Sequence, residues 1–541
     1  MKRLAVPLLL AVLLAGSGCT AQSSAPPPDS ESGVHADWSA LTPYQTPQNQ
    51  YTRRYPGWTE ELIPADDYGN LIPFPGGAAY SEWEGDTWLY GLVTAQGEIV
   101  VDPVYSSAWQ ICIYDDTRRQ TRYLPYLQLV KPSGAAEGEA PLDAEGQAPL
   151  DITIAALDGS WCRSGYSLFF GWSAGCLAAL TQDGQLQVLN EDGSVRWSKS
   201  AEALSFHPGT TLLDTPYMLS GGVLCYWDWE DDYNDMRYYL LDLRDGSFCN
   251  AAEQGLKEIS LYNDIGAVAA QEHNGTTLYG YIDRKGAWIL EPQYLRANVF
   301  SGGYAVVQLK TGEYAVIDQT GDVRLTCGEG ELFCSDNGEG DRVYLNVRKA
   351  GSLDLAQYRS YQQYEVLAAY DADLQPIDTP AAGTQIVWNW DGSYWQLNDS
   401  VMTFGIGSRQ VQLSVPEETF PSGVVWAGDW FTVDWEAREG GGYHSVLYDC
   451  DGTPLTEADA YRSVVQNWDR WTGDPYFVAW LPDGQSCVFL DEKGKVVSST
   501  GTGFHLLRCG GMTLERDNSS VTLTDSGGKT VFCYLDFADD I

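Results

Sequence analysis

The chain has 541 residues, long enough for one large β architecture or for several ordinary domains, so length alone does not decide the fold. Aspartate and glutamate number 74 against 32 lysines and arginines, which gives a formal net charge of −42. Nucleic acid and anionic lipid surfaces bind through positive charge, so we exclude both as expected partners.

The first 18 residues have the layout of a secretory signal peptide. Lys2 and Arg3 precede an apolar run at 4–15, and the small residues at 16–18 lead directly to Cys19. The run is too short to cross a bilayer, which takes about 20 apolar residues. This layout resembles the lipobox of bacterial lipoproteins, in which the cysteine carries lipid and becomes the N-terminus. The alternative is an ordinary secretory signal with an incidental cysteine.

Residues 19–54 are rich in Ser, Pro, Gln and Thr and have little to bury, which predicts a disordered tether. A second low-complexity segment at 132–151 predicts a disordered insertion in a single folded domain at 55–541. No later segment is apolar enough to span a membrane. We therefore expect an exported protein, anchored by lipid at Cys19, that faces the cell wall, the periplasm or the exterior.

From about residue 55 onward, short β-type runs alternate with turns that contain Asp and Gly. Residues 90–108 align without gaps with residues 279–297, where Tyr, Gly, Gly, Pro, Tyr and Ala coincide. A third, shorter copy at 314–321 begins 35 residues after the second and has alanine in place of the first glycine. Repetition at a fixed period indicates copies of one structural unit.

The recurring unit is an apolar residue, then a polar residue that is usually Asp or Asn, then glycine three positions later and a return to apolar residues. In such a unit the polar side chain bonds the turn backbone and glycine takes a positive φ, so the unit predicts the tip of a β-hairpin. Six such tips are expected, at 189–193, 282–286, 317–321, 448–452, 490–494 and 523–527.

Residues 279–294 have the pattern Tyr-Gly-x-Ile-Asp-x-x-Gly-x-x-Ile-x-x-Pro-x-Tyr, and Phe-Ser-Gly-Gly-Tyr-Ala-Val follows at 300–306. Together they resemble the WG-repeat family of bacterial surface and secreted proteins. Residues 186–197 are more weakly similar to quinoprotein-type propeller repeats and to assembly lipoproteins of that fold. Both resemblances imply four-stranded antiparallel meanders. We expect an all-β fold, a propeller of seven or eight blades, with an open β-repeat array as the alternative.

Gly171-Trp172-Ser173-Ala174-Gly175 matches the G-x-S-x-G nucleophile elbow of hydrolases. A working elbow needs a helix after the serine, yet residues 182–184 predict a turn and the next residues a hairpin. His444 and His505, the late candidates for a base, both lie in β-like sequence. We therefore interpret Ser173 as a turn residue and expect no catalytic residues.

No phosphate-binding loop, dinucleotide fingerprint or metal-ligand spacing occurs, so we expect no cofactor and no metal. The acidic turn at 228–235 could ligate Ca²⁺ but lacks the spacing of a calcium loop, and a solvated loop is the alternative. The cysteines other than Cys19 are expected to be mostly free and buried, as at Cys112 and Cys487. Cys327 and Cys334 are the pair to test for a disulfide.

Clustered aromatic residues are the candidates for ligand binding. We name Trp227, Trp229, Trp388 and Trp390, since exposed aromatic faces bind sugars and protein side chains. Further clusters contain Trp395, Trp426, Trp430, Trp468 and Trp471. The competing interpretation is that most of these rings pack between sheets.

Together these observations predict a monomeric, surface-anchored module that binds or scaffolds without catalysis. The expected partner is an envelope or extracellular protein or a glycan, and contact with the membrane is expected only through the N-terminal lipid. One alternative is a carbohydrate-active propeller enzyme that uses a pair of carboxylates. Another is an assembly factor that holds partners by strand addition along a sheet edge.

Overall fold

The structure is a computed structural model that describes residues 52–53, 69–78, 88–115, 120–131, 150–205, 217–229, 236–337, 340–356, 359–389, 391–438, 442–484, 486–500, 505–516 and 520–535. The chain divides into residues 1–39 and residues 40–541, and every described residue belongs to the second unit. The expected signal peptide and Cys19 lie outside the described residues, as does 132–149 of the expected insertion. In the described part of the chain, no helix is long and apolar enough to span a membrane.

The described residues form nine hydrogen-bonded sheets. The first two contain β1 (Thr52–Arg53), β2 (Leu71–Ala78), β3 (Trp88–Thr94) and β4 (Glu98–Tyr105), and then β5 (Ser107–Asp115), β6 (Gln120–Lys131), β7 (Asp151–Ala156), β8 (Cys162–Ser173), β9 (Cys176–Thr181), β10 (Gln185–Leu189) and β11 (Val195–Ser200). Three four-stranded sheets follow, with β12 (Tyr217–Ser220), β13 (Val223–Trp229), β14 (Met236–Asp242) and β15 (Phe248–Asn250); β16 (Leu256–Lys257), β17 (Ala267–His273), β18 (Thr276–Ile282) and β19 (Trp288–Tyr294); and β20 (Arg296–Ala297), β21 (Tyr304–Gln308), β22 (Tyr314–Asp318) and β23 (Val323–Cys327).

The longest sheet contains β24 (Glu331–Asp336), β25 (Arg342–Ala356), β26 (Arg359–Tyr370), β28 (Gln385–Trp388), β29 (Tyr394–Asn398), β30 (Val401–Ile406) and β31 (Arg409–Ser414), with β27 (Pro376–Ile377) beside β26. The last three sheets contain β32 (Thr419–Ala427), β33 (Trp430–Ala437) and β34 (Tyr443–Asp449); β35 (Ser463–Trp468), β36 (Pro475–Trp480), β37 (Cys487–Leu490) and β38 (Val496–Thr500); and β39 (His505–Cys509), β40 (Met512–Arg516), β41 (Ser520–Thr524) and β42 (Thr530–Leu535). Two short 3-10 helices, η2 (Glu202–Leu204) and η4 (Ala252–Gln254), interrupt the strands. Strand β1 lies inside the segment predicted as tether and pairs parallel with β4.

The two long copies of the repeat have the same strand register. In the first, Tyr90 pairs with Tyr105 and Leu92 with Val101. In the second, Tyr279 pairs with Tyr294 and Tyr281 with Leu290, so each partner lies 189 residues further along the chain. In both copies a step of two residues along the first strand corresponds to a step of four along its partner. The extra residues form a bulge in the second strand, opposite the Tyr-Gly pair. The aligned sequence therefore encodes one specific irregular hairpin.

The expected hairpin tips are present, and each aspartate bonds the backbone of its own turn. Asp283 Oδ1 accepts hydrogen bonds from the amides of Lys285 at 2.8 Å and Ala287 at 2.9 Å. The same pair of bonds, to the residues two and four positions later, recurs at Asp318, Asp449, Asp491 and Asp525. Glycine follows with a positive φ, such as 79° at Gly286 and 85° at Gly321. The predicted turn chemistry is confirmed at these five aspartates, although in the last turn the glycine with positive φ is Gly528 rather than Gly527. In the tip at 189–193 the Asn190 side-chain oxygen instead accepts from Arg196.

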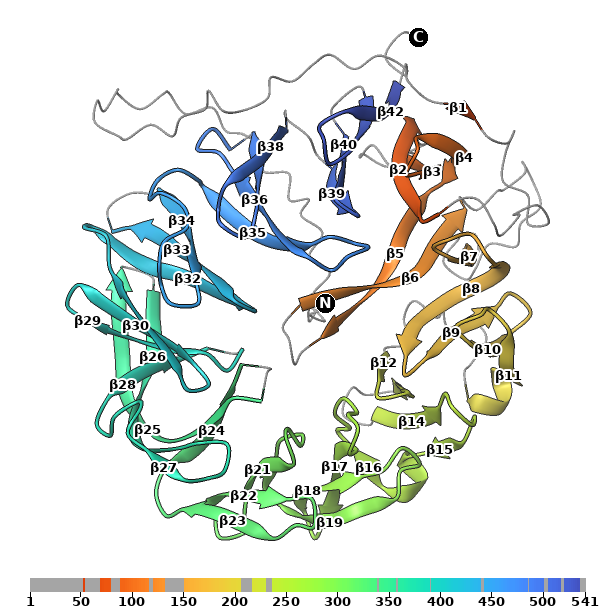
Figure 1. Cartoon of the computed structure of the whole chain (residues 1–541). Coiled ribbons are helices and arrows are strands. Elements are labelled where there is room, and N and C mark those ends of the chain that lie inside the picture. Colours follow the sequence, from red (N-terminus) through yellow and green to blue (C-terminus); the bar gives the residue numbers. More distant parts are fainter. Residues whose placement is uncertain are drawn as a thin grey trace, which may run out of the picture. The chain divides into compact units, whose positions relative to one another are not determined.

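Consecutive sheets bury their apolar faces against one another. Shared hydrophobic clusters join, in turn, the sheets of β1–β4, β5–β11, β12–β15, β16–β19, β20–β23, β24–β31, β32–β34 and β35–β38. The sheet of β35–β38 is linked to that of β39–β42 by hydrogen bonds, such as that from the amide of Arg470 to the carbonyl of Arg508 at 2.9 Å. The last sheet, β39–β42, packs against the first through Leu514 and Phe532 on one side and Ile72 and Phe74 on the other. Figure 1 shows β2 beside β40 and β42.

The packing of the last sheet on the first closes the series, so the fold is an all-β propeller of antiparallel meanders, as predicted, and the open array is excluded. Closure also uses buried polar contacts, because Arg516 Nη1 donates a hydrogen bond to the carbonyl of Pro75 at 3.1 Å. We predicted seven or eight blades, and the described residues form nine sheets. Two of these sheets, with seven and eight strands, are larger than a single four-stranded meander.

Most described cysteines are buried, as expected, including Cys487. Cys112 is exposed, so the prediction that it packs as a buried apolar residue is wrong. Cys327 and Cys334 are both free, so they do not form the disulfide considered for them. Desolvation by burial raises the pKa of both thiols, which keeps them protonated and unreactive at neutral pH.

Candidate functional site

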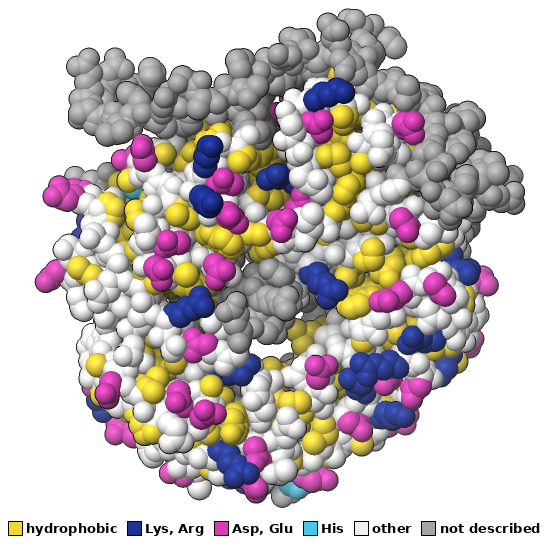
Figure 2. All heavy atoms as spheres, in the orientation of Figure 1, with side chains coloured by type: hydrophobic (Ala, Val, Ile, Leu, Met, Phe, Trp, Pro, Cys, Tyr) yellow, Lys and Arg dark blue, Asp and Glu magenta, His cyan; other side chains and the backbone are white. Residues whose placement is uncertain are grey.

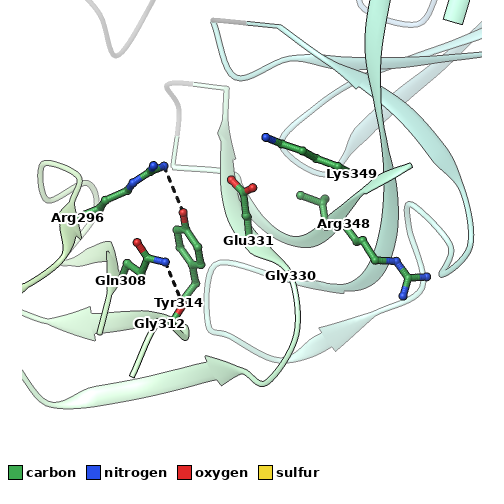
Figure 3. Close-up of a pocket in the computed structure, with 9 residues that line it drawn as sticks. Arg296, Gln308, Gly312, Tyr314, Gly330, Glu331, Arg348 and Lys349 are labelled. Carbon is green, nitrogen blue, oxygen red and sulfur yellow. Dashed lines mark hydrogen bonds between the residues drawn. The ribbon is translucent and has the colours of Figure 1, made fainter. Parts of the chain in front are cut away.

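An open cavity lies between the sheet of β20–β23 and the sheet of β24–β31. Its volume is about 500 Å³ and it is lined by Arg296, Gln308, Gly312, Tyr314, Gly330, Glu331, Val347, Arg348 and Lys349 (Figure 3). We call it the inter-sheet groove. One wall comes from the repeat, through β20, β21, β22 and the turn between the last two, and the other wall comes from β24 and β25.

The repeat wall is held together by two hydrogen bonds. Arg296 Nη1 donates to the hydroxyl of Tyr314 at 3.5 Å, a long bond that sets the guanidinium beside the phenol. Gln308 Nε2 donates to the carbonyl of Gly312 at 3.0 Å, which leaves the side-chain oxygen of Gln308 as an acceptor. Arg296 is exposed, whereas Tyr314 and Gln308 are half-buried. This wall thus presents a cation, a hydroxyl and an amide oxygen side by side.

The facing wall has two basic residues with different roles. Arg348 forms ion pairs with Glu329 at 2.9 Å and with Glu365 at 2.6 Å, and its guanidinium points away from Arg296 in Figure 3. Lys349, the next residue, projects to the other side of the strand, toward the opening above Glu331. This alternation follows from the two-residue period of a β-strand. Arg348 is therefore neutralised within its own wall, and Lys349 is not.

Three charged groups of the inter-sheet groove, Arg296, Lys349 and Glu331, form no ion pair with any other described residue. Their charges sum to one positive charge, in a protein whose formal net charge is −42 and whose surface carries both acidic and basic side chains (Figure 2). The groove is thus a place where a negative group of a ligand meets cations without having to displace an internal partner.

The phenol of Tyr314 is a neutral hydrogen-bonding group at the edge of the groove. Burial raises its pKa above the ordinary value, the Glu331 carboxylate raises it further, and Arg296 opposes this shift. Tyr314 therefore keeps its proton at neutral pH, and its hydroxyl both donates and accepts. Val347 is fully buried in the core of its own sheet, so the ring of Tyr314 is the one aromatic surface of the groove and the other side chains that line it are polar or charged. Such a lining suits a strongly polar ligand.

The proposed aromatic binding residues lie in separate sheets. Trp227, in β13, contacts Tyr238 with ring centroids 5.7 Å apart and packs against the cluster between the sheets of β12–β15 and β16–β19. Trp388, in β28, contacts Phe333 with ring centroids 4.8 Å apart. Trp390 and the side chain of Trp229 lie outside the described residues. These contacts favour packing roles for Trp227 and Trp388, and ligand binding by the four rings stays a prediction.

Other aromatic residues confirm the packing interpretation. Trp395 and Trp426 are each 4% exposed, and Trp426 stacks on Phe431 with centroids 5.0 Å apart. No group of three or more potential metal-ligating side chains occurs in the described ranges. In the acidic turn, 230–235 lie outside the described residues, and Asp228 forms an ion pair with Arg237 at 2.9 Å.

Ser173 of the G-x-S-x-G motif is the last residue of β8 and is 7% exposed. Ala174 and Gly175 have φ values of 51° and 76°, and Ser173 pairs with Cys176, so the motif is a two-residue hairpin turn rather than a strand-to-helix elbow. The Ser173 hydroxyl accepts a hydrogen bond from the amide of Gly222 in the next sheet at 2.9 Å. The interpretation of Ser173 as a turn residue is confirmed.

Sequence reasoning missed every residue of the inter-sheet groove. Arg296 and Gln308 lie within the recognised repeat region, but nothing in their spacing distinguishes them from solvated surface residues. Lys349 lies more than 40 positions beyond Gln308, on another sheet. Their proximity depends on how two sheets pack, and the sequence contains no local signal for that packing.

Comparison with known proteins identifies one segment by sequence. A protein-family profile described as "WG containing repeat" matches residues 279–314, which include part of β18, all of β19 and the groove residues Arg296, Gln308, Gly312 and Tyr314. No match was found among curated proteins.

Three solved structures are among those similar to this chain. The crystal structure of the eukaryotic initiation factor has 10% identity and a TM-score of 0.33, with 86% of this chain and 96% of that chain covered. BamB from Moraxella catarrhalis has 12% identity and a TM-score of 0.23, with 78% and 97% covered. Dihydro-heme d1 dehydrogenase NirN has 13% identity and a TM-score of 0.27, with 65% and 78% covered. These scores are too low to bear on function, and the fold assignment depends on the sheets themselves. By sequence, the likeness of this β-propeller to a known family is confined to residues 279–314, which match the WG containing repeat.

Proposed function

We propose that the protein is a non-catalytic binding module, exported and held at a membrane by lipid on Cys19, that binds a glycan or protein ligand through the inter-sheet groove. The observation that carries the proposal is the groove itself, with Arg296, Lys349 and Glu331 unpaired in a cavity of about 500 Å³. Arg296 and Lys349 are both exposed, so their cationic groups are available for charge-assisted hydrogen bonds with a ligand.

The lining favours binding over glycoside cleavage. Hydrolysis by the usual mechanisms needs two facing carboxyl groups. Glu331 is the one carboxylate that lines the groove, since the nearby Glu329 and Glu365 bind Arg348 on its outer side. A single carboxylate among hydrogen-bonding groups can position a ligand but supplies only half of an acid-base pair.

The test compares the intact protein with the double variant Arg296→Gln/Lys349→Gln on a glycan array and in a pull-down from cell envelopes. We expect the wild-type protein to retain a ligand that the variant loses, with the same unfolding midpoint for both proteins. Chromatography should recover that ligand unchanged after long incubation. Equal retention by the two proteins would contradict the assignment of the groove, and cleavage of the ligand would favour the carbohydrate-active alternative.

The anchoring part of the proposal has its own measurement. Mass spectrometry of the mature protein should find a lipid-modified Cys19 at the N-terminus, and Cys19→Ser should move the protein from the membrane fraction to the soluble one. An unmodified N-terminus at another residue would contradict the lipid anchor and leave the binding proposal intact.

A further inference from the structure

The two unpaired cations of the inter-sheet groove approach from opposite walls. Arg296 belongs to β20 and Lys349 to β25, and in Figure 3 both side chains extend toward the space above Glu331. Neither forms an ion pair within the described part of the chain, so their positive charges are not consumed internally. A carboxylate placed between them would receive charge-assisted hydrogen bonds from two sides.

The rest of the lining suits hydroxyl groups. The Glu331 carboxylate and the side-chain oxygen of Gln308 accept hydrogen bonds, and the protonated Tyr314 hydroxyl donates or accepts. A sugar ring carries several hydroxyls that can donate to the first two. Protein partners generally place apolar and aromatic side chains at the centre of an interface, whereas this groove offers only the half-buried ring of Tyr314 for such a contact, since Val347 is fully buried.

From this juxtaposition we propose that the ligand is an acidic saccharide: a sugar whose ring carboxylate lies between Arg296 and Lys349 and whose hydroxyls bond Glu331, Gln308 and Tyr314. This inference rests on the proposed function and narrows its ligand class. Glu331 has a selective role, because its negative charge opposes a second anionic group at the centre of the groove. The site therefore favours one carboxylate surrounded by hydroxyls over a dense polyanion.

Calorimetric titration of the intact protein with a trisaccharide that contains one galacturonate between two galactose residues tests the inference, and the methyl ester of the same trisaccharide is the matched neutral ligand. We expect the acid to bind and the ester to bind at least about tenfold more weakly, since the ester loses both charge-assisted contacts. Arg296→Gln and Lys349→Gln should each weaken binding of the acid by about tenfold and leave the weak binding of the ester nearly unchanged. Lys257→Gln is the control, because it removes the same charge from a surface pair with Glu272 in another sheet.

Two further ligands separate the sources of the negative charge. Acetate tests a carboxylate without a sugar, and a tetraglutamate peptide tests an acidic peptide. Both should bind at least tenfold more weakly than the acidic trisaccharide. Raising the salt concentration should weaken binding of the acidic trisaccharide but not of its methyl ester. Equal affinity for the acid and its ester, or equal affinity for tetraglutamate, would overturn the inference.

The outcomes also distinguish this inference from the broader proposal. If the protein retains a neutral glycan on the array in a way that depends on the groove, the acidic ligand class is wrong and the binding function stands. If no glycan and no envelope component depends on Arg296 and Lys349, both fail. Because the two side chains are exposed, their substitution should not change the unfolding midpoint, and the midpoint is measured to confirm this.

Discussion

At Gly280 an added Cβ atom would lie 2.5 Å from the carbonyl oxygen of Leu290 and 2.9 Å from the nitrogen of Pro292. Gly91, its counterpart in the first copy, would place a Cβ atom 2.6 Å from the carbonyl oxygen of Val101. In the third copy Ala315 replaces this glycine, and β22 pairs with β23 without the bulge between Tyr314 and Val316. The absent side chain thus permits the bulge, which explains why glycine accompanies the aromatic residue in the two long copies.

Substitution of Gly280 by alanine should therefore destabilise the protein, by about 2 kcal/mol or more, because backbone rather than a flexible side chain blocks the new methyl group. Urea unfolding measures the change. Gly328→Ala is the matched control, since nothing lies within 4 Å of its added Cβ and its φ is not in the left-handed region. A loss of stability equal to that of the control would contradict the role assigned to Gly280.

Ser173 gives a second test at the residue scale, which separates a structural hydroxyl from a nucleophile. Ser173→Ala removes the acceptor for the buried amide of Gly222 and should lower the unfolding free energy by about 1–2 kcal/mol. Ser335→Ala should behave alike, because Ser335 accepts from the amide of Gly407 at 2.8 Å. A fluorophosphonate probe should label neither serine, and labelling of Ser173 would reverse the assignment.

At the scale of elements, polar contacts connect hairpins of neighbouring sheets, in addition to the hydrophobic clusters. The clearest is Asp469, after β35, which is 4% exposed. Its Oδ1 accepts from the amide of Gly510 at 2.7 Å and its Oδ2 from that of Gly511 at 2.8 Å, in the turn between β39 and β40. Burial alone would raise the pKa of this carboxyl, but backbone amides, with Gly511 foremost, lower it below the ordinary value.

The lowered pKa gives Asp469 a pH-dependent contribution to stability. The folded state favours the charged form, so the contribution is complete above the pKa of an unfolded aspartate, about 4, and is lost as the pH falls below it. Asp469→Ala should lower the unfolding free energy by about 2 kcal/mol at pH 7, and Asp469→Asn, which keeps one acceptor, by less. The difference between wild type and Asp469→Asn should shrink when unfolding is followed below pH 4. A difference independent of pH would show that the charge is not what holds the turn.

The elements differ in how far the sequence specifies them. Hairpins tipped by residues such as Asp283 and Asp318 could be predicted because each is formed by contacts within a few residues. The repeat register could be inferred from the alignment of 90–108 with 279–297, since a bulge needs the same glycine and proline in both copies. The inter-sheet groove could not be predicted, because Arg296 and Lys349 come to line the same cavity only through the packing of two sheets. Trp227 and Trp388 were more conspicuous in sequence, yet both contact aromatic neighbours within their own sheets.

At the scale of the whole molecule, the net charge of −42 should act against the compact state through self-repulsion. The described ion pairs lie mostly on exposed surface and do not offset this excess. Raising NaCl from about 10 to 200 mM shortens the Debye length from roughly 30 to below 10 Å and should raise the melting temperature. A melting temperature that falls over this range would mean that the attractive pairs outweigh the repulsion.

The central claim is that the protein binds its ligand between the repeat sheet and the sheet that follows it, without transforming the ligand. Hydrogen-exchange mass spectrometry of the intact protein, with and without the galacturonate-containing trisaccharide, tests this most directly. We predict slower exchange in peptides covering 296–314 and 331–349, with the trisaccharide recovered intact. Protection confined to other sheets, or a cleaved trisaccharide, would contradict the account.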